Sequence, residues 1–239
     1  MSALRKALAE DGLRCADLSG VLISHEHADH CLSVGDLAAG NTPVWSNQDV
    51  LEALKLHGAP QASLISIGEP TVFGDVEVTC FPVSHDAVRP MGFFVRVADR
   101  TIVLATDLGE STGDLTDAVQ NANLVVLEAN HDARMLNEGR YPYFLRRRVA
   151  GPRGHLSNDQ AASILGANLK KPGVDVWLAH LSKENNTPKL ALRTVNRVLK
   201  EAGIPNAYVA TAARDKPSLR WNGIPRPVQL QLFDTVECA

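Results

Sequence analysis

Cysteine is scarce in this sequence of 239 residues, and the few copies are poorly placed for a disulfide framework. The four cysteines are Cys15, Cys31, Cys80 and Cys238, and they form no CxxC pair. Folds that depend on disulfides carry more cysteines at closer spacing. We therefore expect free thiols in a reducing compartment.

Long hydrophobic runs are also missing. The stretch from Pro90 to Val95 is among the longest apolar runs in the sequence, whereas a membrane helix needs roughly 20 such residues. The N-terminus carries Arg5, Lys6 and Glu10 where a signal peptide would have an apolar core. We expect a cytoplasmic protein with no membrane partner.

The sequence has no large excess of either charge. Its net charge is -3 and its pI is about 6.2, which excludes a protein that coats nucleic acid through its overall charge. A polyanionic partner would need a local basic patch. What the sequence does have is 45% hydrophobic and 21% charged residues, the composition of a globular fold. It contains no repeat or long linker, so we expect residues 1–239 to form one domain.

The pattern of apolar residues predicts both strands and helices. The predicted strands are residues 20–24, 76–81, 92–97, 101–106, 124–127 and 174–179. The predicted helices are residues 2–10, 47–57, 158–169 and 188–202, with Ser157 as the N-cap of the third. No helix interrupts residues 76–106, which favours antiparallel hairpins, and helices and strands alternate later. This mixture favours an α+β fold of stacked sheets flanked by helices.

The first predicted strand runs into the segment Ser24-His25-Glu26-His27-Ala28-Asp29-His30, which has three histidines and two carboxylates within six residues. In an extended segment, His25 and His27 point the same way, and Asp29 and His30 begin the next element. One short loop therefore offers ligands to two metal ions. A solvated loop would explain a single HxH pair but does not account for the whole string.

Three further ligand candidates directly follow predicted strands. They are His85, Asp107 and His180, and each would emerge at the carboxyl end of its strand, where loops commonly hold sites. Alone, each could be a core histidine or a turn-forming aspartate. Together with the histidine-rich loop, they predict a site for two metals.

These residues resemble the successive ligand motifs of the metallo-β-lactamase superfamily, in that family's order. The matching segments are His25-x-His27-x-Asp29-His30, Ser84-His85-Asp86, Ala105-Thr106-Asp107-Leu108-Gly109 and Ala179-His180-Leu181-Ser182. The resemblance implies an αββα sandwich of two stacked mixed sheets flanked by helices. It also implies two divalent ions, zinc or manganese, with His25, His27 and His85 on the first, Asp29, His30 and His180 on the second, and Asp107 bridging both. The nucleophile would be a hydroxide held by these metals.

Three longer segments resemble the WalJ/YycJ branch of this superfamily, and the resemblance covers residues 2–235. The segments are residues 127–136, 154–158 and 180–188. That branch implies a DNA exonuclease. An aspartate at position 107, where lactamases of the family usually have Cys or Ser, argues against lactam hydrolysis. The short interval from His85 to Asp107 leaves no room for the protruding arm of many tRNase Z proteins, and no β-CASP domain is present.

Two histidines outside the ligand set are candidates for proton transfer. Glu128 could orient the imidazole of His131, which would protonate a leaving oxygen or grip a phosphate, and His155 could act similarly. Structural hydrogen bonding is the alternative for both. The catalytic candidates are therefore Asp29, Asp107, His131 and His155, and Ser182 and Asn185 are candidates for substrate binding.

Residues 140–153 supply a basic patch. They contain five arginines and no acidic residue, interleaved with Tyr141, Tyr143 and Phe144. Arginines contact phosphates and aromatic rings stack on bases, so we expect Arg146, Arg147 and Arg148 to bind DNA. A solvated helix face would explain the same run without DNA.

The sequence departs from the family at its start. A glycine- and serine-rich strand and turn, then another strand, normally precede the helix that opens here at Ser2. Without them a sheet edge would be unpaired, so we expect either that the recorded start is wrong or that something else covers the edge.

The leading hypothesis is a metal-dependent phosphodiesterase, a DNA exonuclease. One alternative is a hydrolase of a small ester, thioester or cyclic phosphodiester that uses the same metal site. The other is an inactive metal-binding scaffold. The sequence leaves the metal, the polarity of digestion and the oligomeric state open.

Overall fold

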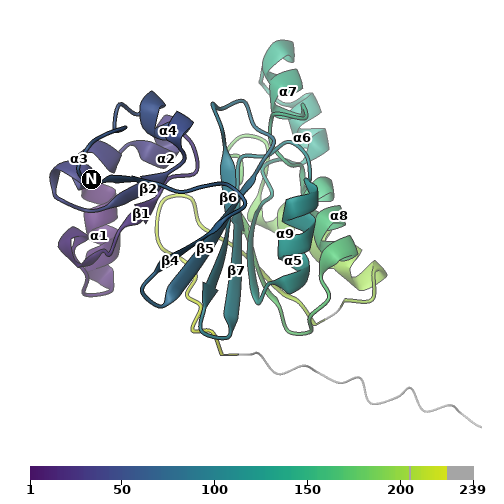
Figure 1. Ribbon diagram of the computed structural model, residues 1–239. Coiled ribbons are helices and arrows are strands. Elements are labelled where there is room, and N and C mark those ends of the chain that lie inside the picture. The colour runs from purple at the N-terminus through teal and green to yellow at the C-terminus, as the bar shows by residue number, and fades with distance from the viewer. Residues whose placement is uncertain (205, 225–239) are drawn as a thin grey trace, which may run out of the picture.

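The structure is a computed structural model that describes residues 1–204 and 206–224. The chain forms two β-sheets with helices outside them (Figure 1). The strands are β1 (Val21–Leu22), β2 (Val44–Ser46), β3 (Ala62–Leu64), β4 (Pro70–Phe73), β5 (Val76–Pro82), β6 (Met91–Val97), β7 (Arg100–Ala105), β8 (Leu124–Glu128), β9 (Asp175–Ala179) and β10 (Tyr208–Thr211). The helices are α1 (Ser2–Glu10), the 3-10 helix η1 (Cys15–Asp17), α2 (Ala28–Cys31), α3 (Val34–Ala39), α4 (Gln48–Ala53), α5 (Gly113–Asn121), α6 (Ala133–Glu138), α7 (Tyr143–Val149), α8 (Asn158–Asn168) and α9 (Pro188–Glu201).

The larger sheet has the strand order β10-β9-β8-β7-β6-β5-β4. Strands β4 to β7 pair antiparallel, as predicted for residues 76–106, and β7 to β10 pair in parallel. The smaller sheet has the order β1-β2-β3. The larger sheet is therefore mixed, as predicted, whereas the smaller one contains only parallel pairs among the residues described.

Apolar clusters join four layers. Val125 of the larger sheet and Leu165 of α8 belong to the cluster between that sheet and its outer helices. Cys80 lies in the cluster between the two sheets. Val44 and Leu51 join the smaller sheet to its own helices. Each layer therefore buries apolar surface against the next, and the predicted αββα sandwich is confirmed.

The predicted elements agree with the structure except at their ends. Every predicted strand is present, with its ends displaced by two residues or fewer. The helix predicted over residues 47–57 stops at Ala53, because Lys55 takes a positive φ of 58° and the chain turns there. Ser157 caps α8 as predicted: its Oγ accepts the Gln160 N–H at 3.2 Å, and Gln160 Oε1 accepts the Ser157 N–H at 2.8 Å.

Two other predictions concern features of the whole chain. Cys15, Cys31 and Cys80 are free thiols, as expected, and Cys238 lies outside the described residues. In the part of the chain that the structure describes, no helix has the length and apolar character needed to span a membrane.

Candidate metal centre and active site

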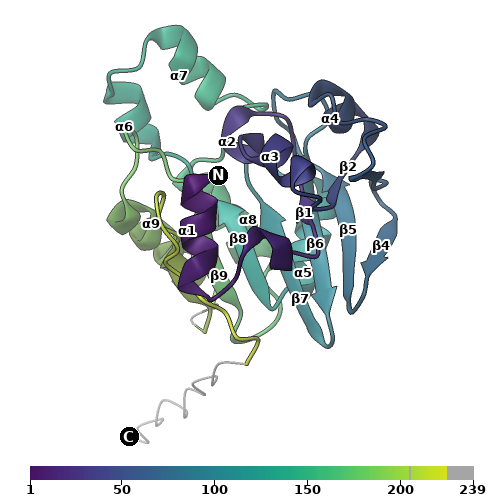
Figure 2. The ribbon, with the colours of Figure 1, turned by 90° about the vertical axis from the view of Figure 1, so that its left-hand side faces the viewer.

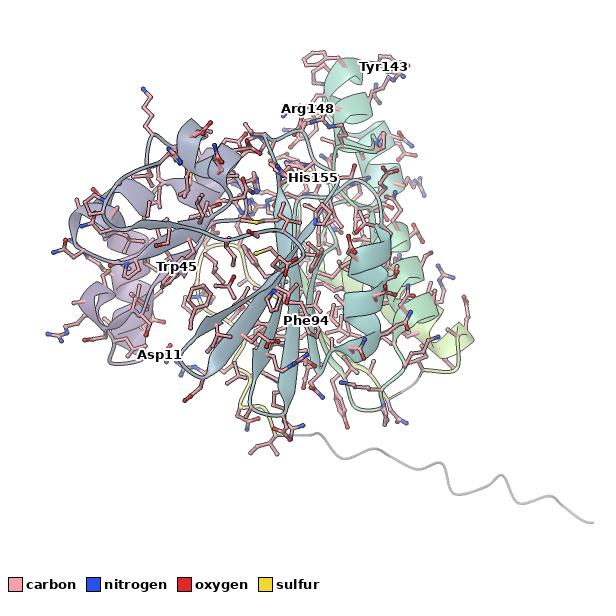
Figure 3. All side chains as sticks on the ribbon, viewed as in Figure 1. Asp11, Trp45, Phe94, Tyr143, Arg148 and His155 are labelled. Carbon is pink, nitrogen blue, oxygen red and sulfur yellow. The ribbon has the colours of Figure 1, made fainter. Side chains whose placement is uncertain are left out.

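Four strands of the larger sheet, β5, β7, β8 and β9, run in the same direction. Their carboxyl ends therefore meet at one edge of the sheet. The side chains at or just after these ends are His85, Asp107, Glu128 and His180. Figure 3 shows His155 at the same edge, below Arg148. The structure agrees with the prediction that His85, Asp107 and His180 emerge at carboxyl ends of strands.

The histidine-rich loop after β1 reaches the same place. His27 is the N-cap residue of α2 and has an extended backbone, so Asp29 and His30 enter a helical turn while the preceding segment stays extended. The ring centroid of His25 lies 4.8 Å from that of His27 and 4.2 Å from that of His30. It lies 5.3 Å from the ring centroid of His85 on the larger sheet. The loop of the small sheet and the edge of the large sheet thus form one cluster.

His25, His27 and His85 form the first candidate metal group, because one ring nitrogen of each lies within 4.8 Å of the others. His25 is 1% exposed, and its buried Nε2 has no hydrogen-bond partner among the described residues. Burial and the nearby His30 lower the pKa of His25 to about 3, so its ring is neutral. The Nδ1 of His85 donates to the Gly154 carbonyl at 3.0 Å, which leaves its Nε2 as an acceptor. An orphaned imidazole nitrogen in a set of three fits a metal ion.

Asp29, His30 and His180 form the second candidate group, with ligand atoms again within 4.8 Å of one another. The Nε2 atoms of His30 and His180 each lie 3.6 Å from Asp29 Oδ2. The Asp29 side chain is 65% exposed, whereas those of His30 and His180 are 20% and 28% exposed. The second group is therefore open to solvent, whereas in the first group His25 and His85 are buried and His27 is half-buried.

Asp107 lies between the two groups. Its buried Oδ2 lies 2.9 Å from His30 Nε2 but has no hydrogen-bond partner of suitable geometry in the described residues, and its Oδ1 is 3.4 Å from His180 Nδ1 and 3.9 Å from His85 Nε2. Burial raises the pKa of this carboxyl, but the close approach of His30 and the charge of His180 outweigh burial and hold the pKa below its usual range. Asp107 and His180 have φ angles of 59° and 55°. Such left-handed backbone costs about 1–3 kcal/mol and is concentrated at functional sites.

Glu128 fixes the histidines beside this centre. It is fully buried, and its Oε1 accepts the Nδ1–H groups of His155 and His180, both at 2.8 Å. Its Oε2 accepts the backbone N–H of Leu108 at 3.0 Å and of Leu156 at 3.2 Å. Burial raises the pKa of Glu128, but these hydrogen bonds outweigh burial and lower it. Because His180 directs Nδ1 at Glu128, it presents Nε2 to the second group.

The predicted pairing of Glu128 with His131 is wrong. The Glu128 carboxylate accepts from His155 and His180 instead, because the segment between α7 and α8 brings His155 to it and the end of β9 brings His180. His131 is 2% exposed, and its Nδ1 has no hydrogen-bond partner in the part of the chain that the structure describes. Burial lowers the pKa of His131 to about 4.

His155 belongs to the cluster of metal-group histidines. Its ring centroid lies 5.1 Å from that of His85 and 5.4 Å from that of His180. Burial lowers the pKa of His155, but the hydrogen bond and charge of Glu128 outweigh burial and raise it. For the same reason, with Asp107 contributing, the pKa of His180 is raised to about 9 despite burial. Glu128 was predicted to orient an imidazole, but the imidazole predicted was the wrong one. Its position at the end of β8, beside the other strand ends, was the sequence signal that places it near the metal groups.

The three predicted DNA-binding arginines differ in their surroundings. Arg148 Nε donates to Asp86 Oδ2 at 2.6 Å, which ties α7 to the neighbour of a candidate ligand. Arg146 donates to the Asn137 carbonyl. Within the described residues, the Arg147 guanidinium makes no hydrogen bond or ion pair. Arg147 is therefore the member of the three that is free to contact a ligand.

Helices α6 and α7, which we call the arm (residues 133–149), extend past the sheet edge that carries the metal groups (Figures 1 and 2). Tyr143 lies at the outer tip of α7, and Arg148 lies nearer the body (Figure 3). Tyr143 and Phe144 are 67% and 72% exposed. The Arg147 guanidinium carbon lies 5.9 Å from the centre of the Tyr143 ring. The arm thus presents a cation and two aromatic rings to solvent.

Ser182 and Asn185 lie in the loop between β9 and α9. Ser182 lines a pocket next to His180. Asn185 is 1% exposed, and within residues 1–204 and 206–224 neither its Nδ2 nor its Oδ1 has a hydrogen-bond partner. The Asn185 N–H donates to Ser182 Oγ at 3.1 Å. Of these two predicted substrate contacts, Ser182 is accessible and Asn185 is buried.

Comparison with known families decides the relationship suggested by the motifs. The model of a family described as beta-lactamase superfamily domain matches residues 3–171. The chain belongs to the beta-lactamase superfamily. The matched segment contains every candidate ligand except His180.

Named relatives support the more specific resemblance. Exodeoxyribonuclease YycJ of Bacillus anthracis is 37% identical over 196 residues, which cover 80% of this chain and 74% of that protein. Exodeoxyribonuclease WalJ of Streptococcus pneumoniae is 35% identical over 204 residues, which cover 82% of this chain and 76% of that one. The crystal structure of YhfI from Bacillus subtilis, a metallo-beta-lactamase fold protein, has a TM-score of 0.64 at 18% identity and covers 87% of this chain and 78% of its own. This superfamily member is accordingly a metal-dependent hydrolase.

Proposed function

We propose that this hydrolase is a DNA exonuclease, a phosphodiesterase that shortens DNA from an end. The observation that carries the proposal is the exposed Arg147, Tyr143 and Phe144 surface of the arm, because the Arg148–Asp86 contact of 2.6 Å attaches that arm to the metal centre. Two relatives at 35–37% identity are named exodeoxyribonucleases, which supports the same substrate. A phosphodiester backbone bound along this surface would contact both the Arg147 guanidinium and the candidate metals.

The residues present fit two divalent ions. We propose His25, His27 and His85 for one ion, Asp29, His30 and His180 for the other, and Asp107 for both. Imidazole and carboxylate ligands suit zinc, and the oxygen ligands also suit manganese. Such ions, when bound, act as Lewis acids that acidify water and stabilise negative charge on a phosphate.

Three other side chains have proposed roles in moving or holding protons. His155 would protonate the leaving oxygen, because the Glu128 hydrogen bond of 2.8 Å orients its ring and raises its pKa despite burial. The exposed Asp29 carboxylate would orient the attacking water at the open side of the second group. His131 is buried, and its pKa is lowered to about 4. It would protonate a leaving oxygen or bind a phosphate only after a rearrangement that exposes it.

The arm would bind the nucleic acid beyond the scissile bond. Base stacking on an aromatic side chain contributes about 1–3 kcal/mol per base, and it tolerates any sequence. Tyr143 and Phe144 are exposed enough to stack, and Arg147 is placed to contact a phosphate. The other predicted arginines, Arg146 and Arg148, would act mainly by holding the arm in place.

The test of the proposed function is degradation of DNA by protein that has been stripped of metal and then reloaded with zinc or manganese. End-labelled duplex DNA and bis(p-nitrophenyl) phosphate are incubated in parallel. We expect metal-dependent loss of DNA from an end, with the label showing the polarity. Turnover of the small diester alone would favour the small-molecule hydrolase, and no turnover of either would favour the inactive scaffold.

Replacing Arg147, Tyr143 and Phe144 together by alanine is expected to weaken DNA binding at least about tenfold, because two stacking surfaces and a cation are lost. The slope of log affinity against log salt should fall by about one, since one phosphate contact is removed. Turnover of bis(p-nitrophenyl) phosphate should stay unchanged. Fluorescence anisotropy with labelled DNA at several salt concentrations measures the binding.

Arg193→Ala is the matched control for this variant, because Arg193 is an exposed arginine on α9, outside the arm. It should bind DNA as tightly as the unchanged protein. Equal loss of DNA and small-diester turnover in the triple variant would show that these residues support the fold instead of the substrate.

A further inference from the structure

A pocket of about 530 Å³ adjoins the metal centre at His180. It is bounded by the loop after β9, the start of α9 and the segment that follows β10. His180 and Ser182 come from the first of these walls, Pro188 from the second and Arg214 from the third. A ligand in the pocket would therefore lie against a residue of the second metal group.

The lining of this pocket is positively charged. Lys183 and Arg214 line it, and in the described part of the chain no aspartate or glutamate does. Arg214 Nη2 donates to the Leu181 carbonyl, which holds the guanidinium beside the loop that follows His180. The remaining N–H groups of Arg214 and the Lys183 ammonium are left for an anion.

Two neutral features add to this preference. Ser182 Oγ accepts the Asn185 N–H at 3.1 Å, and within the described residues its own O–H has no acceptor. Helix α9 has 14 residues, and its first residue, Pro188, lies at the pocket wall. The amino end of a helix carries partial positive charge. Residues with two cations and a hydroxyl donor thus line one pocket, together with the start of a helix.

We infer that this pocket binds the terminal phosphate of the DNA strand that the metal centre cleaves. The inference rests on the proposed exonuclease function and deepens it. A phosphate matches the charge and the donors of the lining. The volume lies within the range of about 300–1,000 Å³ typical of small-ligand sites, so the pocket can take an end nucleotide together with its phosphate.

The position of His180 links the pocket to the reaction. The same residue lines the pocket and belongs to the second metal group. A phosphate held by Lys183 and Arg214 would therefore place the next phosphodiester of that strand at the metals. Recognition of the end would then set which bond is cut, and the enzyme would act more slowly on ends that carry only a hydroxyl.

The test compares duplexes that carry a phosphate or a hydroxyl at their 5′ ends, and separately at their 3′ ends. We expect metal-reloaded protein to prefer phosphate at one kind of end by about tenfold, the effect of losing a charged hydrogen bond. The Lys183→Ala/Arg214→Ala variant should lose this preference and keep its turnover of bis(p-nitrophenyl) phosphate. Both side chains are exposed, so their removal leaves the core intact. Arg193→Ala/Lys200→Ala removes the same charge from α9 outside the pocket and should keep the preference.

The outcomes separate this inference from the proposed function. DNA degradation with no phosphate preference, or with a preference that the double variant retains, would overturn the pocket assignment and leave the exonuclease standing. If DNA is not degraded, the exonuclease falls, and calorimetric binding of deoxynucleoside 5′- and 3′-monophosphates decides about the pocket. Binding about tenfold weaker in the double variant would then support a phosphate pocket. Equal affinity would overturn it.

Discussion

Replacing Asp107 by asparagine is expected to lower the turnover of both DNA and bis(p-nitrophenyl) phosphate by about three orders of magnitude, which corresponds to about 4 kcal/mol of transition-state stabilisation. The reason is the position of this carboxylate, with Oδ2 2.9 Å from His30 and Oδ1 3.4 Å from His180. An amide has one acceptor oxygen and no charge, so it cannot serve both groups. Asparagine is chosen over alanine because φ is 59° at this position and asparagine tolerates left-handed backbone.

The measurement is steady-state turnover at saturating metal, with metal content and circular dichroism recorded for the same sample. Asp117→Asn is the matched control, because it makes the same chemical change at an exposed position on α5. The control should behave as the unchanged protein. Near-normal activity of the Asp107 variant with a full metal complement would refute the two-metal mechanism.

The histidine-rich loop shows why much of this site is predictable from sequence. His25 and His27 stand two residues apart after a strand, and extended geometry alone places them together. His85, Asp107 and His180 share a simpler property, since each follows a strand and parallel strands end at one edge. Secondary structure therefore locates these ligands before any tertiary contact is known.

The features that could not be predicted from the sequence depend on tertiary contacts. Glu128 also follows that rule, but only the folded chain shows that its partners are His155 and His180, which come from distant segments. The arginines of α7 look alike in sequence, yet Arg148 is tied to Asp86 and Arg147 is free of hydrogen bonds in the described chain. Strands such as β2 and β3 were omitted because three residues are too few to show alternation.

The pocket beside His180 also could not be predicted from the sequence. Lys183 and Arg214 are separated by a helix and a strand, and no sequence pattern joins Lys183, in the segment 180–188, to Arg214. Parallel pairing of β10 with β9 brings the segment after β10 alongside the loop after β9. Ser182 was predicted as a substrate contact from the sequence alone. The structure adds Lys183 and Arg214, which line the same pocket and supply the positive charge that a serine lacks.

Glu128→Gln is expected to lower metal affinity by about 10–100-fold, the usual effect of removing a carboxylate that orients a metal-binding histidine. Glu128 accepts four hydrogen bonds, two from imidazoles and two from the backbone N–H groups of Leu108 and Leu156. An amide places an NH2 group against one of these pairs of donors. If the NH2 group faces the histidines, the Nδ1 of His180 must accept a hydrogen bond, and the His180 proton moves to Nε2. Nε2 then faces the second metal group with a proton where a lone pair is needed. If the NH2 group faces the backbone, two buried N–H groups lose their acceptor, and the free energy of unfolding should fall by about 1–3 kcal/mol.

Competition with a chelator measures the metal affinity, and chemical denaturation of the metal-free protein measures the stability. Glu69→Gln, at an exposed position before β4, is the matched control and should change neither. The Glu128 variant should recover part of its activity in excess metal, because its ligands themselves are intact. This recovery distinguishes it from Asp107→Asn, in which a proposed ligand is lost and added metal cannot restore the turnover. Unchanged metal affinity in Glu128→Gln would mean that the His180 ring is held by its left-handed backbone, at φ 55°, without need of the buried carboxylate.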